Sequence, residues 1–199
     1  LCGGRLDIGL GAGEATECER YGLDVETRGQ RFDETVRIMK RLWTEKVVTF
    51  EGAVHTVRGA GLRPPTVQQP HPPLYFGGRV PAARRRAVEL GDGFIGAGAT
   101  STRDFAQHVQ HLRGLLAAAG SPPGSFPIGK RVYLHIDDDR DAAMAHLGAW
   151  FRRFYGDYVT PGEVAVFGGV AACVAQLREV IEAGAEFPLL NPVAKDPEQ

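Results

Sequence analysis

The stretch PPLYFGGRVPAARRRAVELGDGFIG, residues 72–96, decides the fold of this sequence. It begins with a short apolar run at 74–76 and ends with a second one at 94–95. Between them lie a Gly pair and an amphipathic, Arg-rich segment at 82–90. Pro81 stands at the start of this segment, where a proline costs no helical hydrogen bond. The stretch therefore predicts a strand, a helix and a second strand, joined by the right-handed connection of parallel sheets.

The same alternation continues on both sides of this unit. Period-two or short apolar runs predict further strands at 5–11, 131–137 and 187–190, and a small hairpin at 47–57. Apolar residues at three-to-four-residue spacing predict helices at 27–43, 101–120, 141–155 and 174–181. The proline-rich segment 62–73 is an extended connector, and 164–167 is short and ambiguous. About five core strands alternate with helices, which predicts an α/β fold. An open doubly wound sheet and part of an eight-stranded barrel both fit this pattern.

Composition limits the classes of function. The chain has 199 residues, 43% of them hydrophobic and 24% charged, which suits one globular domain over residues 1–199. A formal net charge of -1 provides no long-range field for nucleic acid or an anionic membrane. No apolar run approaches the ~20 residues of a membrane helix, and three cysteines without CxxC spacing indicate reduced thiols. We expect a cytoplasmic protein without nucleic-acid or membrane partners.

Three segments resemble the second half of proteins of the bacterial luciferase-like superfamily, namely residues 4–43, 72–94 and 183–193. This family comprises barrel enzymes that are flavin-dependent monooxygenases or oxidoreductases dependent on the deazaflavin coenzyme F420. The most specific motifs are GAGE at 11–14, RGQRFDE at 28–34 and the spacing from the Gly pair to GDG at 91–93. The resemblance implies a (β/α)8 TIM barrel of which this chain carries strands 4 to 8, with the N-terminal part absent.

A partial barrel leaves two strand edges with unpaired backbone groups, which favour pairing with another chain. We therefore expect a fragment of a longer protein, with an assembly that closes between subunits as the alternative. Dimers are common in the family, so the resemblance is compatible with a homodimer. It also implies that the absent strands supply much of the pocket around the cofactor ring.

The Gly pair marks the first candidate site. Glycines between a strand and a helix let a ligand approach the backbone, and the free N–H groups of the first helical turn favour an anion such as phosphate. Gly77, Gly78, Arg79 and Val80 occupy this junction. A plain turn explains the same pattern. The resemblance implies that the junction touches the ring and the phosphate of the cofactor.

A second candidate site follows the predicted strand at 5–11. Barrel active sites lie at the carboxyl ends of the strands, where Gly11, Gly13 and Glu14 stand. The stretch GAGEATE resembles F420-dependent sugar-phosphate dehydrogenases, which implies that both glycines contact the cofactor and that Glu14 is the catalytic proton donor. A carboxyl group needs burial to hold a proton near neutrality. An exposed loop carboxylate is the alternative.

Other chemistries have no candidate. The six histidines show no HExxH or similar ligand spacing, so no metal site is predicted. The run Arg84–Arg86 lies on one predicted helix of a nearly neutral chain, which favours a solvent-facing stripe with salt bridges over a nucleic-acid site. No GxSxG elbow, P-loop or GxGxxG fingerprint occurs, so nucleophilic hydrolysis has no candidate residue.

We therefore predict an F420-dependent oxidoreductase that moves a hydride to or from a small organic substrate. An FMN-dependent monooxygenase of the same superfamily is the first alternative. A shortened, non-catalytic flavoprotein or interaction module, which pairs its strand edges with a partner, is the second.

Overall fold

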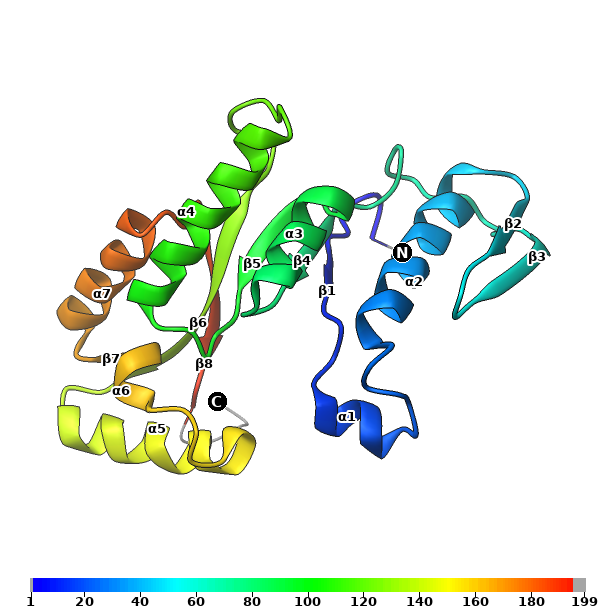
Figure 1. The fold of residues 1–199 in the computed structure, drawn as a ribbon. Coiled ribbons are helices and arrows are strands. Elements are labelled where there is room, and N and C mark those ends of the chain that lie inside the picture. Colours follow the sequence, from blue (N-terminus) through cyan, green and yellow to red (C-terminus); the bar gives the residue numbers. More distant parts are fainter. Residues whose placement is uncertain (1, 195–199) are drawn as a thin grey trace.

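The computed structural model describes residues 2–194, which form a six-stranded parallel sheet, a separate hairpin and the helices that connect them (Figure 1). The sheet consists of β1 (Ile8–Leu10), β4 (Leu74–Gly77), β5 (Gly93–Gly96), β6 (Ile128–Ile136), β7 (Val166–Gly168) and β8 (Phe187–Pro192). The hairpin consists of β2 (Val48–Glu51) and β3 (Thr56–Ala60). The helices are α1 (Ala15–Arg20), α2 (Arg28–Thr44), α3 (Pro81–Leu90), α4 (Thr102–Ala118), α5 (Arg140–Tyr155), α6 (Pro161–Val164) and α7 (Val170–Glu182). The predicted α/β class and hairpin are confirmed.

The long strand β6 organises the sheet because three strands pair with it. Lys130 pairs with both β5 and β8, so these two strands lie on opposite edges of β6. Leu134 pairs with both Val166 of β7 and Pro192 of β8, so these strands also lie on opposite edges. It follows that β5 and β7 occupy successive stretches of one edge. The ambiguous segment at 164–167 thus contributes a short sixth strand rather than a loop.

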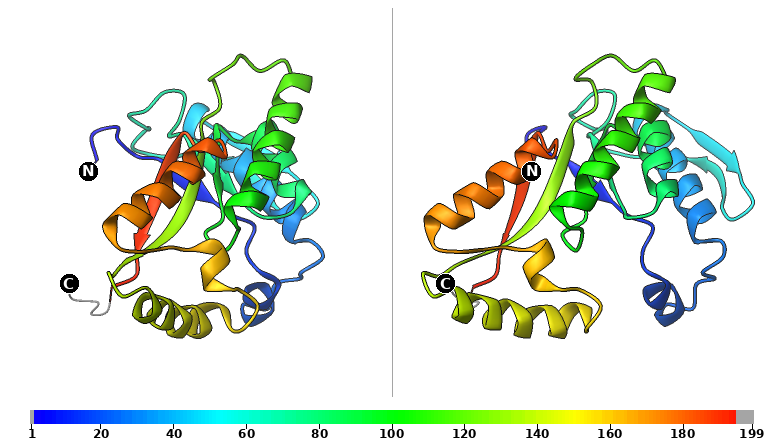
Figure 2. Two further views of the ribbon diagram at one scale, coloured as in Figure 1. Left: turned by 90° about the vertical axis from the view of Figure 1, so that its left-hand side faces the viewer. Right: turned by 60° about the vertical axis from the view of Figure 1, so that its left-hand side comes forward.

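Both ends of the sheet are open within residues 2–194. There, β1 pairs only with β4, and β8 pairs only with β6. The β1–β4–β5–β6–β8 ladder is parallel throughout, as in an arc of a barrel. Figure 2 shows β8 and β1 as separate strands of this arc.

The two faces of the sheet differ in what covers them. On β4, Leu74 and Phe76 are buried in the main core with residues of α2, α3, α4 and α7, so this face is the outer, helix-covered one. Tyr75 and Gly77 alternate with them and point to the opposite, inner face. The inner face is where the interior of a barrel lies. Helices α1 and α5 both lie at the lower end of the sheet in Figure 1, where the strands finish.

The run Arg84–Arg86 is the predicted solvent-facing stripe with salt bridges only in part. Arg85 is exposed, and Arg86 makes a salt bridge from Nε to Asp33 Oδ1 at 2.6 Å. The prediction is wrong for Arg84, which is only 6% exposed because it lies on the same face of α3 as the fully buried Ala87, three residues later. Within residues 2–194, no helix combines the length and the apolarity needed to cross a membrane.

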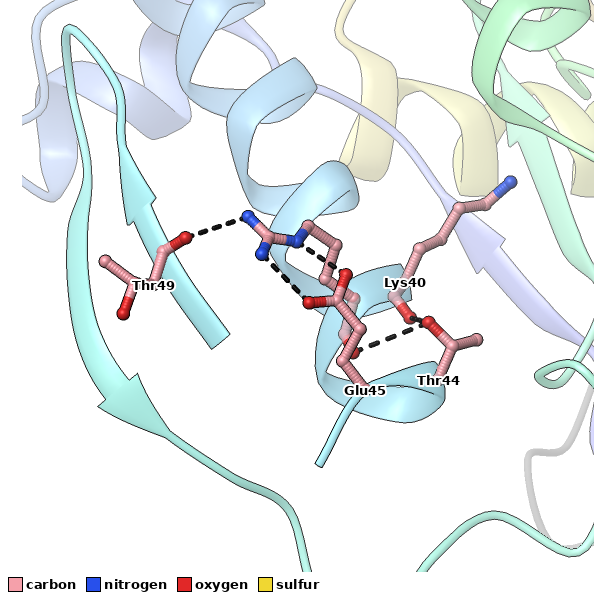
Figure 3. Close-up of polar contacts among 5 residues, drawn as sticks. Lys40, Thr44, Glu45 and Thr49 are labelled. Atoms are coloured by element: carbon pink, nitrogen blue, oxygen red, sulfur yellow. Dashed lines mark hydrogen bonds and ion pairs between the residues drawn. The ribbon is translucent and has the colours of Figure 1, made fainter. Parts of the chain in front are cut away.

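The hairpin is attached to the end of α2 by polar contacts (Figure 3). Arg41 donates two hydrogen bonds to the Glu45 carboxylate, at 2.7 and 2.9 Å, and a third to the carbonyl of Thr49 on β2 at 2.9 Å. The hydroxyl of Thr44 donates to the carbonyl of Lys40 at 2.9 Å. The paired carboxylate holds the guanidinium in one orientation, which fixes where the hairpin leaves the helix.

Candidate functional site

One row of residues across three strands forms the floor of the inner face. Gly9 of β1 pairs with Tyr75 of β4, which pairs with Gly93 of β5. A Cβ added at Gly93 would lie 2.5 Å from the Tyr75 ring, whereas a Cβ added at Gly9 would meet nothing within 4 Å. The ring therefore leans over Gly93, and its edge packs on Phe187 of β8 with the ring centroids 5.8 Å apart. The space above Gly9 stays open as a result.

This open space is part of a cavity of about 330 Å³, which we call the inner cavity. Its floor is glycine-rich backbone at the carboxyl ends of β1, β4 and β5, together with the loop at 97–99. Its walls include Arg79 after β4, Arg131 on β6, and the aromatic residues Tyr155 and Tyr158. Parallel strands direct their carboxyl ends to one side of the sheet, which explains why distant segments meet here.

Arg79 and Glu14 face each other across one side of the inner cavity. Their closest atoms, Arg79 Nη2 and Glu14 Oε1, are 4.0 Å apart. The guanidinium carbon of Arg79 also lies 5.8 Å from the centroid of the Tyr158 ring, within the range of a cation–π contact. The side chain of Glu14 is 72% exposed, so the burial that a proton donor needs is not provided by the described residues alone.

Arg131 brings a second cation to the inner cavity. Its guanidinium lies 4.9 Å from the centroid of the Tyr133 ring, and its Nε donates to the Asn191 side chain on β8 at 3.2 Å. The hydroxyl groups of Tyr133 and Tyr155 are hydrogen bonded to each other. Burial, followed by this hydrogen bond, raises the pKa of Tyr133, so its phenol stays protonated. Arg131 is thus fixed on one side and open toward the cavity.

The structure separates the sequence-predicted residues into two groups. Glu14, Gly77, Gly78 and Arg79 line the inner cavity together, although Glu14 and the Gly pair are far apart in the sequence. Gly11, Gly13 and Val80 do not line it. Gly13 has a φ of 79° where the chain turns into α1, and Val80 is 59% exposed at the N-cap of α3. These three remain predictions as cofactor contacts.

Sequence reasoning did not single out Gly9, Arg131, Tyr155 or Tyr158. Arg131 is a charged residue on a strand whose other residues are mostly apolar, but the sequence does not show which face of this strand lies inward. No sequence signal identifies Tyr155 and Tyr158, because they reach the cavity only through the path of the chain after β6.

A second cavity lies on the outer face and contains none of the predicted site residues. Its volume is about 550 Å³, and it is bounded by the start of α4, by α6 and by α7. Lys130 of β6, which is 1% exposed, forms part of its floor, and burial lowers the pKa of this lysine to about 8.

Within residues 2–194, no three histidine, cysteine or carboxylate side chains are grouped to hold a metal ion.

Comparison with known proteins identifies a matching family and several relatives of this chain. Residues 1–186 match the family model described as luciferase-like monooxygenase. The 5,10-methylenetetrahydromethanopterin reductase of Archaeoglobus fulgidus is 32% identical over 145 residues, which are 72% of this chain and 42% of that protein. The F420-dependent glucose-6-phosphate dehydrogenase of Rhodococcus erythropolis is 32% identical over 156 residues, with 74% and 45% covered. The FMNH2-dependent dimethylsulfone monooxygenase of Pseudomonas putida is 28% identical over 149 residues, with 73% and 40% covered. The chain therefore spans 40–45% of the length of these relatives.

Solved structures share the fold. An F420-dependent secondary alcohol dehydrogenase in complex with an F420-acetone adduct has a TM-score of 0.84 at 24% identity, covering 98% of this chain and 66% of the other. The coenzyme F420-dependent tetrahydromethanopterin reductase from Methanopyrus kandleri has a TM-score of 0.74 at 17% identity, covering 98% and 71%. These likenesses confirm that the open sheet is the expected arc of a TIM barrel.

Proposed function

The chain belongs to the luciferase-like monooxygenase family, and from this premise we propose that it is an oxidoreductase whose inner cavity binds coenzyme F420. The proposed reaction is hydride transfer to or from a small organic substrate. The F420-dependent glucose-6-phosphate dehydrogenases among the relatives are 29–32% identical to this chain, compared with 28% for the FMNH2-dependent monooxygenase. The observation that carries the proposal is the convergence of two arginines on a glycine-floored cavity at the strand ends.

The residues that line the inner cavity fit a flat ring that carries a phosphate group. Gly9 leaves room for a ring to lie against the strand backbone. Arg79 and Arg131 offer guanidinium groups, which bind phosphate through paired N–H donors. Tyr155 and Tyr158 offer aromatic surface beside them. When bound, F420 supplies the hydride donor or acceptor, while these residues bind and orient it.

We assign Glu14 as the group that carries a proton to or from the substrate. Its carboxylate lies at the rim of the inner cavity, opposite Arg79. A ligand seated in the cavity would remove water from this side of the carboxylate, which is the condition for proton transfer by a carboxyl group.

Titration of the purified protein with F420 and with FMN tests the proposed function. We expect F420 to bind at least about tenfold more tightly than FMN, as measured by cofactor fluorescence. Loss of F420 absorbance on addition of alcohols, aldehydes or sugar phosphates then measures hydride transfer. Tighter binding of FMN would support the monooxygenase alternative. If neither cofactor bound, the proposal would be overturned in favour of a non-catalytic module.

Glu14→Gln is expected to lower the turnover number about a hundredfold, because a positioned acid or base contributes about 10²–10⁴-fold to a rate. The Kd for F420 should stay within about threefold, since the exposed pair of Glu14 with Arg79 adds little binding energy. Glu17→Gln is the control in the same turn of chain, because Glu17 accepts a hydrogen bond from the backbone N–H of Glu14 but does not line the cavity. Equal turnover in Glu14→Gln and the wild type would make Glu14 a loop carboxylate without a catalytic role.

A further inference from the structure

Arg84 is a buried cation directly behind the Gly77–Val80 turn. It is 6% exposed, and none of the described carboxylates lies within ion-pair distance of it. Burying a charge without a counter-ion costs free energy unless its N–H groups are hydrogen bonded. Arg84 therefore differs from its neighbour Arg85, which is exposed to solvent.

The guanidinium of Arg84 makes two hydrogen bonds that connect three parts of the fold. Its Nη1 donates to the backbone carbonyl of Arg79 at 2.9 Å. Its Nε donates to Nδ1 of His111 on α4, also at 2.9 Å. The side chain thus holds the turn after β4 from one side and is itself anchored to the neighbouring helix on the other.

The carbonyl that Arg84 binds lies in the turn between β4 and α3. Gly78 has a φ of 145°, and Arg79 immediately precedes Val80, the N-cap of α3. The Arg79 side chain extends from this same residue toward Glu14 and Tyr158 in the inner cavity. The carbonyl that Arg84 holds therefore belongs to the backbone from which the Arg79 guanidinium extends.

We propose that Arg84 is a positioning residue, which holds the Gly77–Val80 turn in one conformation and thereby places the Arg79 guanidinium to meet the phosphate of the cofactor. The placement of Arg79 toward the phosphate rests on the proposed function. The ordering of the Gly77–Val80 turn rests on the two hydrogen bonds alone. Arg84 itself touches neither cofactor nor substrate, because it does not line the inner cavity.

The charges around Arg84 are compatible with this role. Burial, and then the charge of Arg85, lower the pKa of Arg84, but a guanidinium remains protonated in proteins. Burial, and then Arg84, lower the pKa of His108, so this histidine is neutral near pH 7. His111 accepts a hydrogen bond at Nδ1 and is therefore also without a proton on that nitrogen. The region behind the turn carries positive charge, which favours an anion in front of it.

Three variants test the proposal. Arg84→Leu removes both hydrogen bonds and places an apolar side chain at this buried position of α3. Arg84→Lys keeps the charge but carries its N–H donors on a single nitrogen, which cannot reproduce the two hydrogen bonds made from Nε and Nη1. Arg85→Leu is the matched control, because Arg85 is the exposed neighbour on the same helix. Hydrogen–deuterium exchange of the cofactor-free protein reports on the Gly77–Val80 turn, fluorescence titration gives the Kd for F420, and thermal unfolding monitors the fold.

In Arg84→Leu we expect exchange in the turn to accelerate and the Kd for F420 to rise, each about tenfold, which is the typical effect of losing one hydrogen bond to a charged group. Arg84→Lys should lie between Arg84→Leu and the wild type, and Arg85→Leu should match the wild type. Unchanged exchange in Arg84→Leu would overturn the positioning role. Faster exchange with an unchanged Kd would overturn its link to the cofactor. Failure of the proposed function looks different, because the wild type itself would then not bind F420.

Discussion

Gly9→Leu is expected to abolish binding of F420 while leaving the protein folded. A Cβ at this position meets nothing within 4 Å, so the new side chain enters the inner cavity instead of clashing with the protein. A leucine there occupies a substantial part of a cavity of only about 330 Å³ and covers the backbone that the ring would approach. We expect the Kd for F420 to rise at least about a hundredfold, because binding sites of this kind enclose most of their ligand's surface. Fluorescence titration measures the effect.

The control for this variant is Gly114→Leu on the exposed face of α4, where an added Cβ also meets nothing within 4 Å. It should bind F420 as the wild type does. Both variants should unfold at nearly the wild-type temperature. Tight F420 binding by Gly9→Leu would show that the cofactor lies elsewhere, and the inner cavity would lose its assignment.

Gly93→Val is expected to prevent stable folding. A Cβ at Gly93 would lie 2.5 Å from the Tyr75 ring and 2.9 Å from the carbonyl oxygen of Pro127. The ring is held by Phe187, and the carbonyl belongs to the backbone next to β6, so neither can move without disturbing the sheet. Overpacking of this severity costs about 3 kcal/mol or more, a large fraction of the stability of a typical domain. Soluble yield and urea unfolding, followed by circular dichroism, measure the loss.

Gly9→Val is the matched control, because it makes the same change in the same row of the sheet, on the other side of Tyr75. It should fold, since its Cβ position is open and valine is favoured in strands. A wild-type unfolding midpoint for Gly93→Val would show that the Tyr75 ring can leave its place over β5, and the explanation for the open inner cavity would fail.

Most of the fold could be predicted because its signals are local. The alternation of Leu74 and Phe76 with Tyr75 defines a strand, and the observed strand extends the predicted one by a single residue, Gly77. The helices at 28–44 and 140–155 agree with the expected ranges to within one residue at each end. The elements that were not predicted are α1 and α6, and the segment of β7 was left ambiguous. These elements have three to six residues, too few for a period, and β7 depends on pairing with a strand about thirty positions earlier.

The candidate site could be predicted only in part. Glu14 and the Gly77–Arg79 junction both follow predicted strands, and they meet in one cavity because parallel strands bring their carboxyl ends together. Arg131 required knowing which face of β6 looks inward, which a strand buried on both faces does not reveal. Arg84 was misjudged because three successive arginines suggest solvent, although helical spacing from Arg84 to Ala87 already indicates a shared buried face.

Because β5 and β7 share one edge of β6, the segment between β6 and β7 can change in length while the rest of the sheet stays the same. The segment 137–165 leaves the sheet after β6 and returns as β7, where Ile136 pairs with Gly168 and Leu134 with Val166. Because its two ends are fixed side by side, an insertion in its exposed turn at 156–158 has a small entropic cost and leaves the β5–β6 ladder in place. Since the segment carries Tyr155 and Tyr158, such a change would alter the walls of the inner cavity while the strands that form its floor stay in place.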